Sequence, residues 1–337
     1  MDRRDRPAGE TLRWGILSTA AIAREKVIPG IQKARRSRIV AIGSRDEARG
    51  RAVAEAWGIP HIHASYEALL ADPEVDAVYL PLPNHLHREW TIAAARAGKH
   101  VLCEKPLALT SADAQAMLDV AEAEGVLLME AFMYRLHPSW IAVRELIASG
   151  RIGRLAAVQT WFGYYNDDPV NIRNIREVGG GALYDIGCYA VNLSRLLFDG
   201  EPTRVVAAAS RDPDSGVDTL MSGILEFGDG VATFTCSTRT ETDQRVHVYG
   251  TTGRISIEIP FNIPPDRPTR VFVTAGGTPP VAPATETLTV PIADPYTVEA
   301  ETFASAVLDG TPLPVRKDDA VANLRVIERL FAAAEER

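Results

Sequence analysis

The chain has 337 residues, of which 46% are hydrophobic and 24% are charged, and its formal net charge is -8. At roughly 100–200 residues per domain, this length predicts two domains with sizeable cores. The acidic balance argues against a surface that neutralises nucleic-acid phosphates, so no nucleic-acid partner is expected. No apolar run reaches the roughly 20 residues that span a bilayer, and we expect no membrane partner either.

The cysteines and the N-terminus bear on location. Cys103, Cys188 and Cys236 are widely spaced and form no disulfide framework or zinc pattern, so we expect buried thiols in a reducing compartment. The segment 1–10 is charged and lacks the apolar core of a signal peptide. We expect it to be a frayed tail and the protein to be cytoplasmic.

The first part of the chain alternates between apolar strands and helical stretches. Near-continuous apolar strands separated by helices predict a parallel sheet covered on both faces, that is, a Rossmann-type doubly wound α/β domain at 1–133. The expected strands are 12–17, 38–42, 76–80, 100–103 and 126–129. The expected helices are 22–33, 48–57, 87–97 and 111–124.

The pattern changes after about Met133. Strands with alternating apolar residues and glycine-containing turns predict an α+β domain at 134–337 with an open, mostly antiparallel sheet. The expected strands are 156–162, 220–227, 231–238, 245–249 and 254–259. We expect a long helix at 182–198, a long loop with short strands at 260–295, and closing helices at 298–308 and 318–334.

The turn after the first strand is the candidate phosphate-binding turn. It runs from Ser18 to Ala23 and, overlaid on G-x-G-x-x-G, places Ser18, Ala20 and Ala23 at the glycine positions. Small residues let a backbone approach a pyrophosphate, and a helix N-terminus offers free N–H groups to an anion. We therefore assign cofactor contacts to Ser18, Thr19, Ala20 and Ile22. An ordinary strand-to-helix turn explains this segment alone equally well.

The end of the second strand bears on the choice of cofactor. NAD-selective sites carry an Asp or Glu there to hold the ribose 2′-hydroxyl. This chain has Gly43-Ser44-Arg45 instead, so a 2′-phosphate meets no carboxylate and Arg45 and Ser44 can bond to it. The sequence favours NADP(H) over NAD(H), although an exposed surface arginine is the alternative reading of Arg45.

Glu104-Lys105-Pro106 follows the fourth strand at the edge where a nicotinamide would lie. A cation there can polarise a substrate oxygen and lower the pKa of a neighbouring acid. Pro106 restricts the backbone of Lys105. We assign Glu104 to the cofactor and Lys105 to both cofactor and catalysis; a surface lysine ahead of a helix is the alternative.

A second centre follows the glycines at 179–181. Asp185 and Tyr189 are four residues apart and therefore share one face of the expected helix. The carboxylate can bind a substrate hydroxyl, and the phenol can exchange a proton with a carbinol oxygen if a lysine lowers its pKa from about 10. A buried tyrosine and a dipole-stabilised aspartate are the alternative for an isolated pair.

The histidine pairs His61/His63 and His85/His87 have the spacing of residues on one strand face. No third ligand is apparent, so we predict no metal site. The prolines Pro81 and Pro83, together with Asn84, are expected to shape a loop on the cofactor side.

Several of these segments together resemble the Gfo/Idh/MocA oxidoreductase family. The Glu-Lys-Pro block and the Gly-Gly-Ala-Leu-x-Asp-x-Gly block, some 75 residues apart, are quite specific to it. The blocks that carry the resemblance are Arg13–Leu17 with its turn, Gly43–Arg45, Pro81–His87, Glu104–Pro106 and Gly180–Gly187.

The resemblance implies a Rossmann domain, a second domain whose sheet commonly packs against another subunit, and hence a dimer or tetramer. It implies that Lys105 lies beside the nicotinamide and that Asp185 contacts substrate. A tyrosine at Tyr189 is typical of the branch with glucose–fructose oxidoreductase, NADP-linked xylose dehydrogenases and dimeric dihydrodiol dehydrogenases. Further implied cofactor contacts are Leu80, Pro81, Asn84 and His87. Further residues expected near the substrate are Tyr134, Arg135, His137 and Phe162.

From these features we expect an NADP(H)-dependent oxidoreductase. Tyr189 is the expected general acid/base, Lys105 its electrostatic partner and Asp185 a substrate anchor. The resemblance implies a sugar or polyol substrate, either an aldose oxidised to a lactone or a keto-sugar that is reduced. Two alternatives stay open: a trans-dihydrodiol dehydrogenase or dicarbonyl reductase, favoured if Trp161, Phe162 and Tyr164 line the cleft, and a non-catalytic NADP(H)-sensing protein.

Overall fold

The computed structural model describes residues 10–276 and 284–335, so residues 1–9 of the expected tail at 1–10, the segment 277–283 and residues 336–337 lie outside it. The chain forms two compact units. The first contains Met1–Met133 and Pro295–Ala320, and the second contains Tyr134–Asp294 and Val321–Arg337. Within the described residues, no helix is both long and apolar enough to cross a membrane.

The first unit contains a six-stranded sheet with the order β3-β2-β1-β4-β5-β6. All neighbouring strands are parallel. This confirms the predicted Rossmann-type sheet and adds one strand, β3, that its short, polar sequence did not indicate. The strands are β1 (Leu12–Leu17), β2 (Ser37–Gly43), β3 (His61–His63), β4 (Ala77–Leu80), β5 (His100–Glu104) and β6 (Leu128–Ala131).

Helices connect these strands, and their ends have clear causes. Asp46 accepts a hydrogen bond from the backbone N–H of Arg49 at the start of α2, and Gly58 ends that helix at φ 64°. Thr110 caps α5 in the same way. The helices are η2 (Ala23–Val27), α1 (Ile28–Lys33), α2 (Glu47–Trp57), α3 (Tyr66–Leu70), η3 (Asn84–Leu86), α4 (His87–Arg96) and α5 (Ser111–Ala123).

The helix α8 (Pro295–Asp309) belongs to the first unit, although we predicted this part of the chain to lie in the C-terminal domain. It packs so closely on α1 that a Cβ at Gly30 would lie 2.6 Å from the Cβ of Tyr296. The Thr297 hydroxyl donates to the Gly30 carbonyl at 3.0 Å. The ring centroids of Phe303 and Trp14, on β1, are 5.2 Å apart. The chain therefore returns to complete its first core.

The second unit contains an eight-stranded sheet with the order β14-β13-β12-β11-β7-β10-β9-β8. Among the described strands, only the β10–β7 pair is parallel, which confirms the predicted mostly antiparallel sheet. The segment 260–295, expected as a long loop with short strands, contributes two seven-residue strands, of which β14 is at the edge of the sheet and β13 is next to it. The strands are β7 (Leu155–Tyr165), β8 (Arg204–Arg211), β9 (Asp218–Phe227), β10 (Gly230–Ser237), β11 (Arg239–Gly250), β12 (Gly253–Ile257), β13 (Thr269–Ala275) and β14 (Ala284–Val290).

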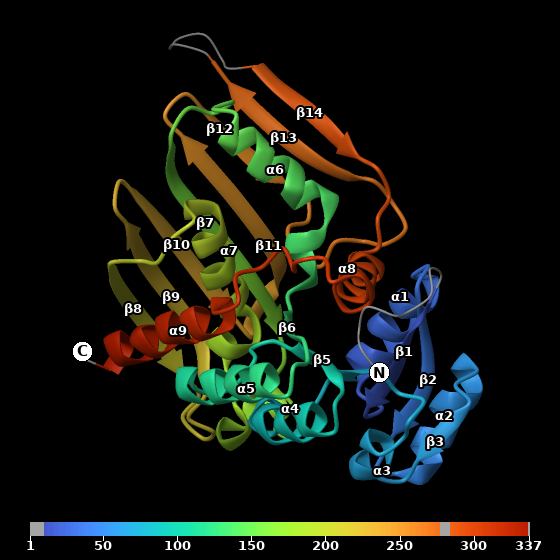
Figure 1. The fold of residues 1–337 in the computed structure, drawn as a ribbon. Helices are drawn as coiled ribbons and strands as arrows, with labels where there is room; N and C mark the ends of the chain where they lie inside the picture. Colours follow the sequence, from blue (N-terminus) through green and yellow to red (C-terminus); the bar gives the residue numbers. More distant parts are fainter. Residues whose placement is uncertain (1–9, 277–283, 336–337) are drawn as a thin grey trace. The chain divides into compact units, whose positions relative to one another are not determined.

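Helices cover one face of this sheet, where Figure 1 shows α6, α7 and α9. A Cβ at Gly223 on β9 would lie 3.1 Å from Leu330 of α9, so that helix lies directly on the sheet. The expected helix at 182–198 is present as a π-helical turn followed by α7. The elements are η4 (Met133–Leu136), α6 (Pro138–Ala148), η5 (Ile172–Asn174), η6 (Arg176–Val178), η7 (Leu183–Gly187), α7 (Cys188–Phe198) and α9 (Asp319–Glu335).

The other face of the sheet is hollowed. Side chains of β7–β11 line a depression of about 540 Å³ there, among them Trp161, Ile224 and Arg245. Ile224 is 41% exposed.

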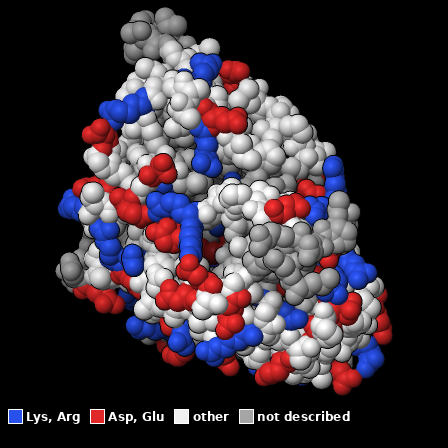
Figure 2. All heavy atoms as spheres, in the orientation of Figure 1, with Lys and Arg blue, Asp and Glu red and all other residues white. Residues whose placement is uncertain are grey.

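On the molecular face drawn in Figure 2, basic and acidic side chains are interspersed.

Candidate active site

The predicted cofactor residues of the first unit lie at the carboxyl ends of neighbouring parallel strands. Ser18 follows β1, Ser44 follows β2, Pro81 follows β4 and Lys105 follows β5. The strand order reverses between β1 and β4, which pair with each other. In open α/β sheets, ligands bind beyond the carboxyl ends at this switch point.

The turn after β1 has a glycine-like backbone without a glycine. Ser18 adopts φ 118°, which a residue with a Cβ rarely does. Its hydroxyl oxygen accepts a hydrogen bond from the Ala20 N–H at 3.1 Å, and the Arg24 guanidinium donates to the Thr19 carbonyl at 3.1 Å. Ser18, Thr19, Ala20 and Ile22 are all half-buried. The turn thus presents a small, partly exposed backbone at the start of a helix, which fits a pyrophosphate.

Ser44 and Arg45, which follow β2, differ in their exposure to solvent. The Ser44 side chain is buried, its hydroxyl donates to the Asp46 carbonyl at 2.7 Å, and its N–H donates to the His63 carbonyl at 3.0 Å. Arg45 is exposed. Burial raises the pKa of the Tyr66 phenol, and the nearby Arg45 guanidinium opposes that rise. Arg45 is therefore the group at this end that can reach an outside anion.

The loop after β5 contains a cis peptide bond between Lys105 and Pro106. Its carbonyl and amide groups are held from two sides. The His87 ring lies with Nδ1 3.0 Å from the Pro106 carbonyl and Nε2 2.7 Å from the Leu82 carbonyl, and Glu130 accepts from the Leu107 N–H at 2.7 Å. Burial lowers the pKa of His87 to about 4, and the hydrogen bonds to the Leu82 and Pro106 carbonyls oppose that shift.

Glu104 is fixed in the same loop. The Tyr79 hydroxyl donates to its Oε1 at 2.5 Å, and its Oε2 accepts from the Lys105 N–H at 3.3 Å. Burial, followed by the Glu104 charge, raises the pKa of Tyr79 well above its usual value. Lys105 itself is only half-buried. The loop is thus rigidly supported while its lysine remains accessible.

In the second unit, the glycines at 179–181 create the start of η7. Gly181 adopts φ 116°, and a Cβ there would lie 2.0 Å from Oδ1 of Asp218. Oδ2 of Asp218 accepts from the Leu183 N–H at 2.7 Å. Burial raises the pKa of Asp218 to about 6. Only glycine leaves room for this carboxyl, which satisfies a free N–H group of the helix start.

Asp185 lies on η7 and is held by two partners. Its Oδ2 accepts from the Tyr164 hydroxyl at 2.5 Å and from Nε of Arg173 at 3.0 Å. Burial, followed by the Asp185 charge, raises the pKa of Tyr164. The carboxylate is therefore oriented, and Arg173, whose side chain is 43% exposed, is the more accessible member of the pair.

Tyr189 lies one helical turn further along, in a cluster of aromatic rings. Its ring centroid is 5.2 Å from that of Phe261 and 5.7 Å from those of Phe162 and Tyr134. Phe162 and Tyr164 are two residues apart on β7, so their side chains point to the same face of the sheet. Because Tyr189 packs on Phe162 and Asp185 bonds to Tyr164, the predicted pair lies side by side over β7.

Comparison with known proteins gives the family. Residues 12–132 match the family described as an oxidoreductase family with an NAD-binding Rossmann fold, and residues 140–256 match the GFO/IDH/MocA C-terminal domain. The chain belongs to the Gfo/Idh/MocA oxidoreductase family. This confirms the resemblance, the fold class and the prediction of an NAD(P)-dependent oxidoreductase.

Individual relatives extend the comparison. The chain is 42% identical to D-xylose 1-dehydrogenase (NADP(+)) 2 of Haloferax volcanii, over 96% of this chain and 98% of that one. It is 33% identical to trans-1,2-dihydrobenzene-1,2-diol dehydrogenase of Mus musculus, over 73% and 74% of the two chains. Among solved structures, a 3-ketoreductase from Actinomadura kijaniata in complex with NADP and TDP-benzene is 29% identical, with a TM-score of 0.88 over 96% of this chain and 98% of that one.

Some predicted site residues of this Gfo/Idh/MocA protein lie in its core instead of at a surface. Tyr134 is completely buried, and its hydroxyl donates to Asn192 at 2.7 Å. Phe162 is stacked on Phe261, and Arg135 is buried. His137 caps the start of α6 by accepting from the Ser139 N–H. These side chains shape the surroundings of Tyr189.

Several other predicted side chains have positions that limit their roles. His87 is fully buried, so it supports the Lys105 loop instead of facing a ligand. Leu80 and Pro81 are buried, while Asn84 is half-buried at the start of η3. Trp161 points to the sheet face opposite Phe162 and Tyr164, because neighbouring strand residues alternate. The three aromatic residues named for a dihydrodiol site therefore do not line one cleft.

Sequence reasoning missed the residues that position others. Tyr79 and Glu130 hold the Lys105 loop, and Arg173 and Asn192 bond to Asp185 and Tyr134. A buried tyrosine and a glutamate at the ends of apolar strands were a signal that could have found the first two. No pattern in the sequence pointed to Arg173.

Proposed function

We propose that this protein is an NADP(H)-dependent oxidoreductase that interconverts a CH–OH and a C=O carbon of a sugar or sugar derivative. The observation that carries the proposal is the strand order of the first unit, which brings Lys105 to the same sheet edge as the Ser18 turn and Arg45. The relative named as an NADP-linked D-xylose dehydrogenase, similar along nearly the full chain, supports both the cofactor and the substrate class.

The residues at the switch point fit a dinucleotide. The backbone at Ser18 and Thr19, ahead of η2, offers N–H groups to a pyrophosphate, and no carboxylate directly ends β2. Because the Ser44 hydroxyl is engaged by Asp46, the exposed Arg45 is the proposed reader of the 2′-phosphate. A bound nicotinamide supplies the capacity to accept or give a hydride.

Three side chains are assigned to the chemistry. Lys105 supplies a positive charge that stabilises a developing alkoxide, and its loop is fixed by Glu104, His87 and Glu130. Tyr189 is the general acid/base that gives or takes the proton of the carbinol oxygen. Asp185, oriented by Arg173, accepts a hydrogen bond from a second substrate hydroxyl.

Oxidation of a trans-dihydrodiol, or reduction of a dicarbonyl compound, is the second candidate. The aromatic rings of Tyr134, Phe162 and Phe261 around Tyr189 suit an apolar substrate, and the mouse relative carries the dihydrodiol name. The position of Trp161 on the opposite sheet face weighs against it.

The experiment is a turnover screen of the purified full chain with NADP(H) and, in parallel, with NAD(H). The substrates are D-xylose, other pyranoses, polyols, keto-sugars, diketones and a trans-dihydrodiol. We expect turnover of a sugar and a higher kcat/KM with NADP(H). Turnover confined to dihydrodiols or diketones would support the second candidate, and NADP(H) binding without turnover on any compound would support a cofactor-sensing protein.

We also infer self-association and a cytoplasmic location. The sheet face lined by Trp161, Ile224 and Arg245 carries no helix in the described part of the chain, and large uncovered sheet faces commonly pair. Cys103, Cys188 and Cys236 are all free and buried, as in a reducing compartment. Light scattering of the full chain tests the first inference, because a monomeric mass at micromolar concentration would contradict it.

A further inference from the structure

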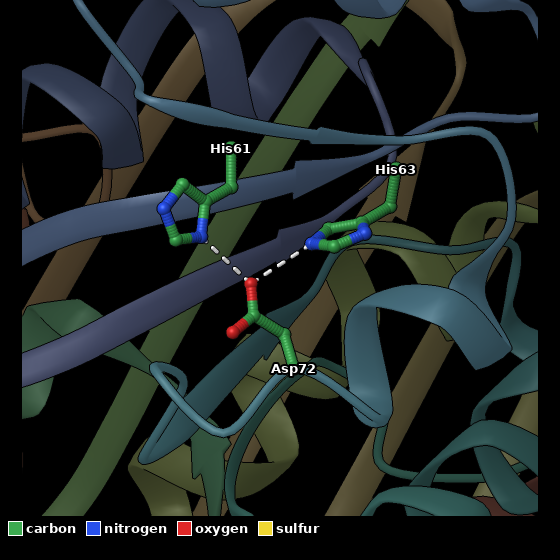
Figure 3. A group of neighbouring side chains, drawn as sticks. All are labelled: His61, His63 and Asp72. Carbon is green, nitrogen blue, oxygen red and sulfur yellow. Dashed lines mark hydrogen bonds and ion pairs between the residues drawn. The ribbon is translucent and has the colours of Figure 1, made fainter.

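Two histidines and one aspartate converge in the first unit, at the edge of its parallel sheet (Figure 3). His61 and His63 are two residues apart on β3, so their rings lie on the same side of the strand. Nδ1 of His61 lies 2.8 Å from Oδ2 of Asp72, and Nε2 of His63 lies 2.9 Å from the same oxygen. Asp72 stands nine positions beyond His63, just after α3, which is why the sequence showed no third ligand.

The carboxylate at the centre of this cluster is buried, while the two imidazoles beside it are partly exposed. The Asp72 side chain is 7% exposed, whereas the side chains of His61 and His63 are 42% and 22% exposed. The charge is thus buried on one side and flanked by imidazoles on the side open to solvent.

The cationic side chains near this cluster, Lys99 and Arg13, are bonded to other groups. The Lys99 ammonium donates to the carbonyl oxygens of Asp72 and Val75 and does not touch the carboxylate. Arg13 is paired with Glu74 and Asp76. The Glu74 N–H occupies Oδ1 of Asp72, which leaves Oδ2 as the atom on which both rings converge. Among the described residues, the nearby cations Lys99 and Arg13 thus bond to other oxygens and not to Oδ2 of Asp72.

The donor set matches the preferences of a particular class of ion. Imidazole nitrogen and carboxylate oxygen are common ligands of zinc, at about 2.0–2.2 Å. A tetrahedral ion with such bonds spaces its ligand atoms by about 3.3 Å. The three donor atoms here lie within 4.8 Å of one another. The His61 Nδ1 and His63 Nε2 atoms lie 2.8 and 2.9 Å from Oδ2 of Asp72, so each of these distances must lengthen by about half an ångström to admit an ion. Because the side chains of both histidines are partly exposed, their rings can make that shift.

We propose that His61 Nδ1, His63 Nε2 and Asp72 Oδ2 bind a divalent transition-metal ion, with zinc as the best match, and that water completes the coordination. The ion would fasten the three-residue strand β3, which pairs only with β2, to the segment after α3. The site lies apart from the Lys105 loop along the sheet order, so its role is structural. It also stands independently of the proposed function, because metal binding is measured without substrate.

The experiment is a calorimetric titration of the metal-free full chain with zinc chloride. We expect one saturable site in the wild type and at least about a tenfold loss of affinity in the double variant His61→Gln/His63→Gln, because two of the three ligands are removed. His85→Gln is the matched control, since His85 is an exposed histidine on η3 of the same unit. It should bind zinc like the wild type.

A second measurement separates ligand loss from unfolding. Zinc should raise the Tm of the wild type and of His85→Gln but not that of the double variant, and the double variant should retain the wild-type circular dichroism spectrum without metal. Cobalt substitution should give the visible absorption of a four-coordinate site in the wild type and in His85→Gln but not in the double variant. Zinc affinity that is equal in the wild type and the double variant, or absent from both, would overturn the proposal.

Discussion

Ser18 and Gly181 both have a positive φ, and each lies at the start of a helix that carries candidate site residues. Ser18 tolerates its φ of 118° because its hydroxyl accepts the Ala20 N–H. At Gly181 no side chain is tolerated, since a Cβ would collide with Asp218. A positive φ is thus stabilised by a side-chain hydrogen bond at Ser18, and at Gly181 it is allowed by the absence of a side chain.

The substitution Gly181→Ala should destabilise the second unit by about 2–4 kcal/mol, because it adds backbone strain and displaces the buried Asp218 carboxyl. Gly150→Ala is the matched control: its φ is 72° and nothing lies within 4 Å of the added Cβ, so about 1 kcal/mol is expected. Urea unfolding of both variants makes the comparison. Equal losses would show that the contact with Asp218 is unimportant.

The residues that the sequence could locate are those tied to a strand end or a helical spacing. Lys105 follows an apolar strand, and Asp185 and Tyr189 share one helix face, so their placement on the elements was predictable. Tyr134 was not, because its burial depends on Asn192, far along the chain. Asp72 was not either, since its approach to His63 depends on the turn of α3.

At the scale of elements, the start of η7 depends on a carboxyl group from β9. Asp218 is buried, accepts the Leu183 N–H, and has its pKa raised from 3.8 to about 6. Between these pH values the folded state binds the extra proton. Its contribution to stability is therefore complete below pH 3.8 and is lost as the pH rises through about 6.

We expect the free energy of unfolding of the wild type to fall, relative to Asp218→Asn, by about 1–3 kcal/mol between pH 4.5 and pH 7. The amide keeps an acceptor for the Leu183 N–H but does not titrate. The measurement is urea unfolding of both proteins across this range. Asp72 does not interfere, because its lowered pKa places its loss of stability below pH 3.8. Parallel pH profiles would contradict the assignment.

Elements with strong periodicity were predictable, and short or polar ones were not. The apolar strands β1, β4 and β5 were found from sequence within a few residues. The strand β3 has only three residues with two histidines, so its pairing with β2 supplies what its composition does not. The strands β13 and β14 lie in a segment rich in proline, glycine and threonine, so short strands within a long loop were expected there but their bounds were not.

At the scale of the whole molecule, the chain passes from the first unit to the second and returns. The sequence placed α8 in the C-terminal domain because it follows that domain in order. Its packing is decided instead by tertiary contacts, including Tyr296 against Gly30 and Phe303 against Trp14. A return of this kind leaves no local pattern, which is why periodicity cannot reveal it.

The central claim is that this protein transfers hydride with the help of Lys105, and the kcat of Lys105→Ala on the sugar found in the screen tests it most directly. We expect a loss of at least about 100-fold, with a similar loss in Tyr189→Phe and with NADP(H) binding largely retained, because charge stabilisation and proton transfer are removed. Lys317→Ala, which breaks only an exposed ion pair with Glu122, should turn over like the wild type. Near wild-type turnover by Lys105→Ala would contradict the account.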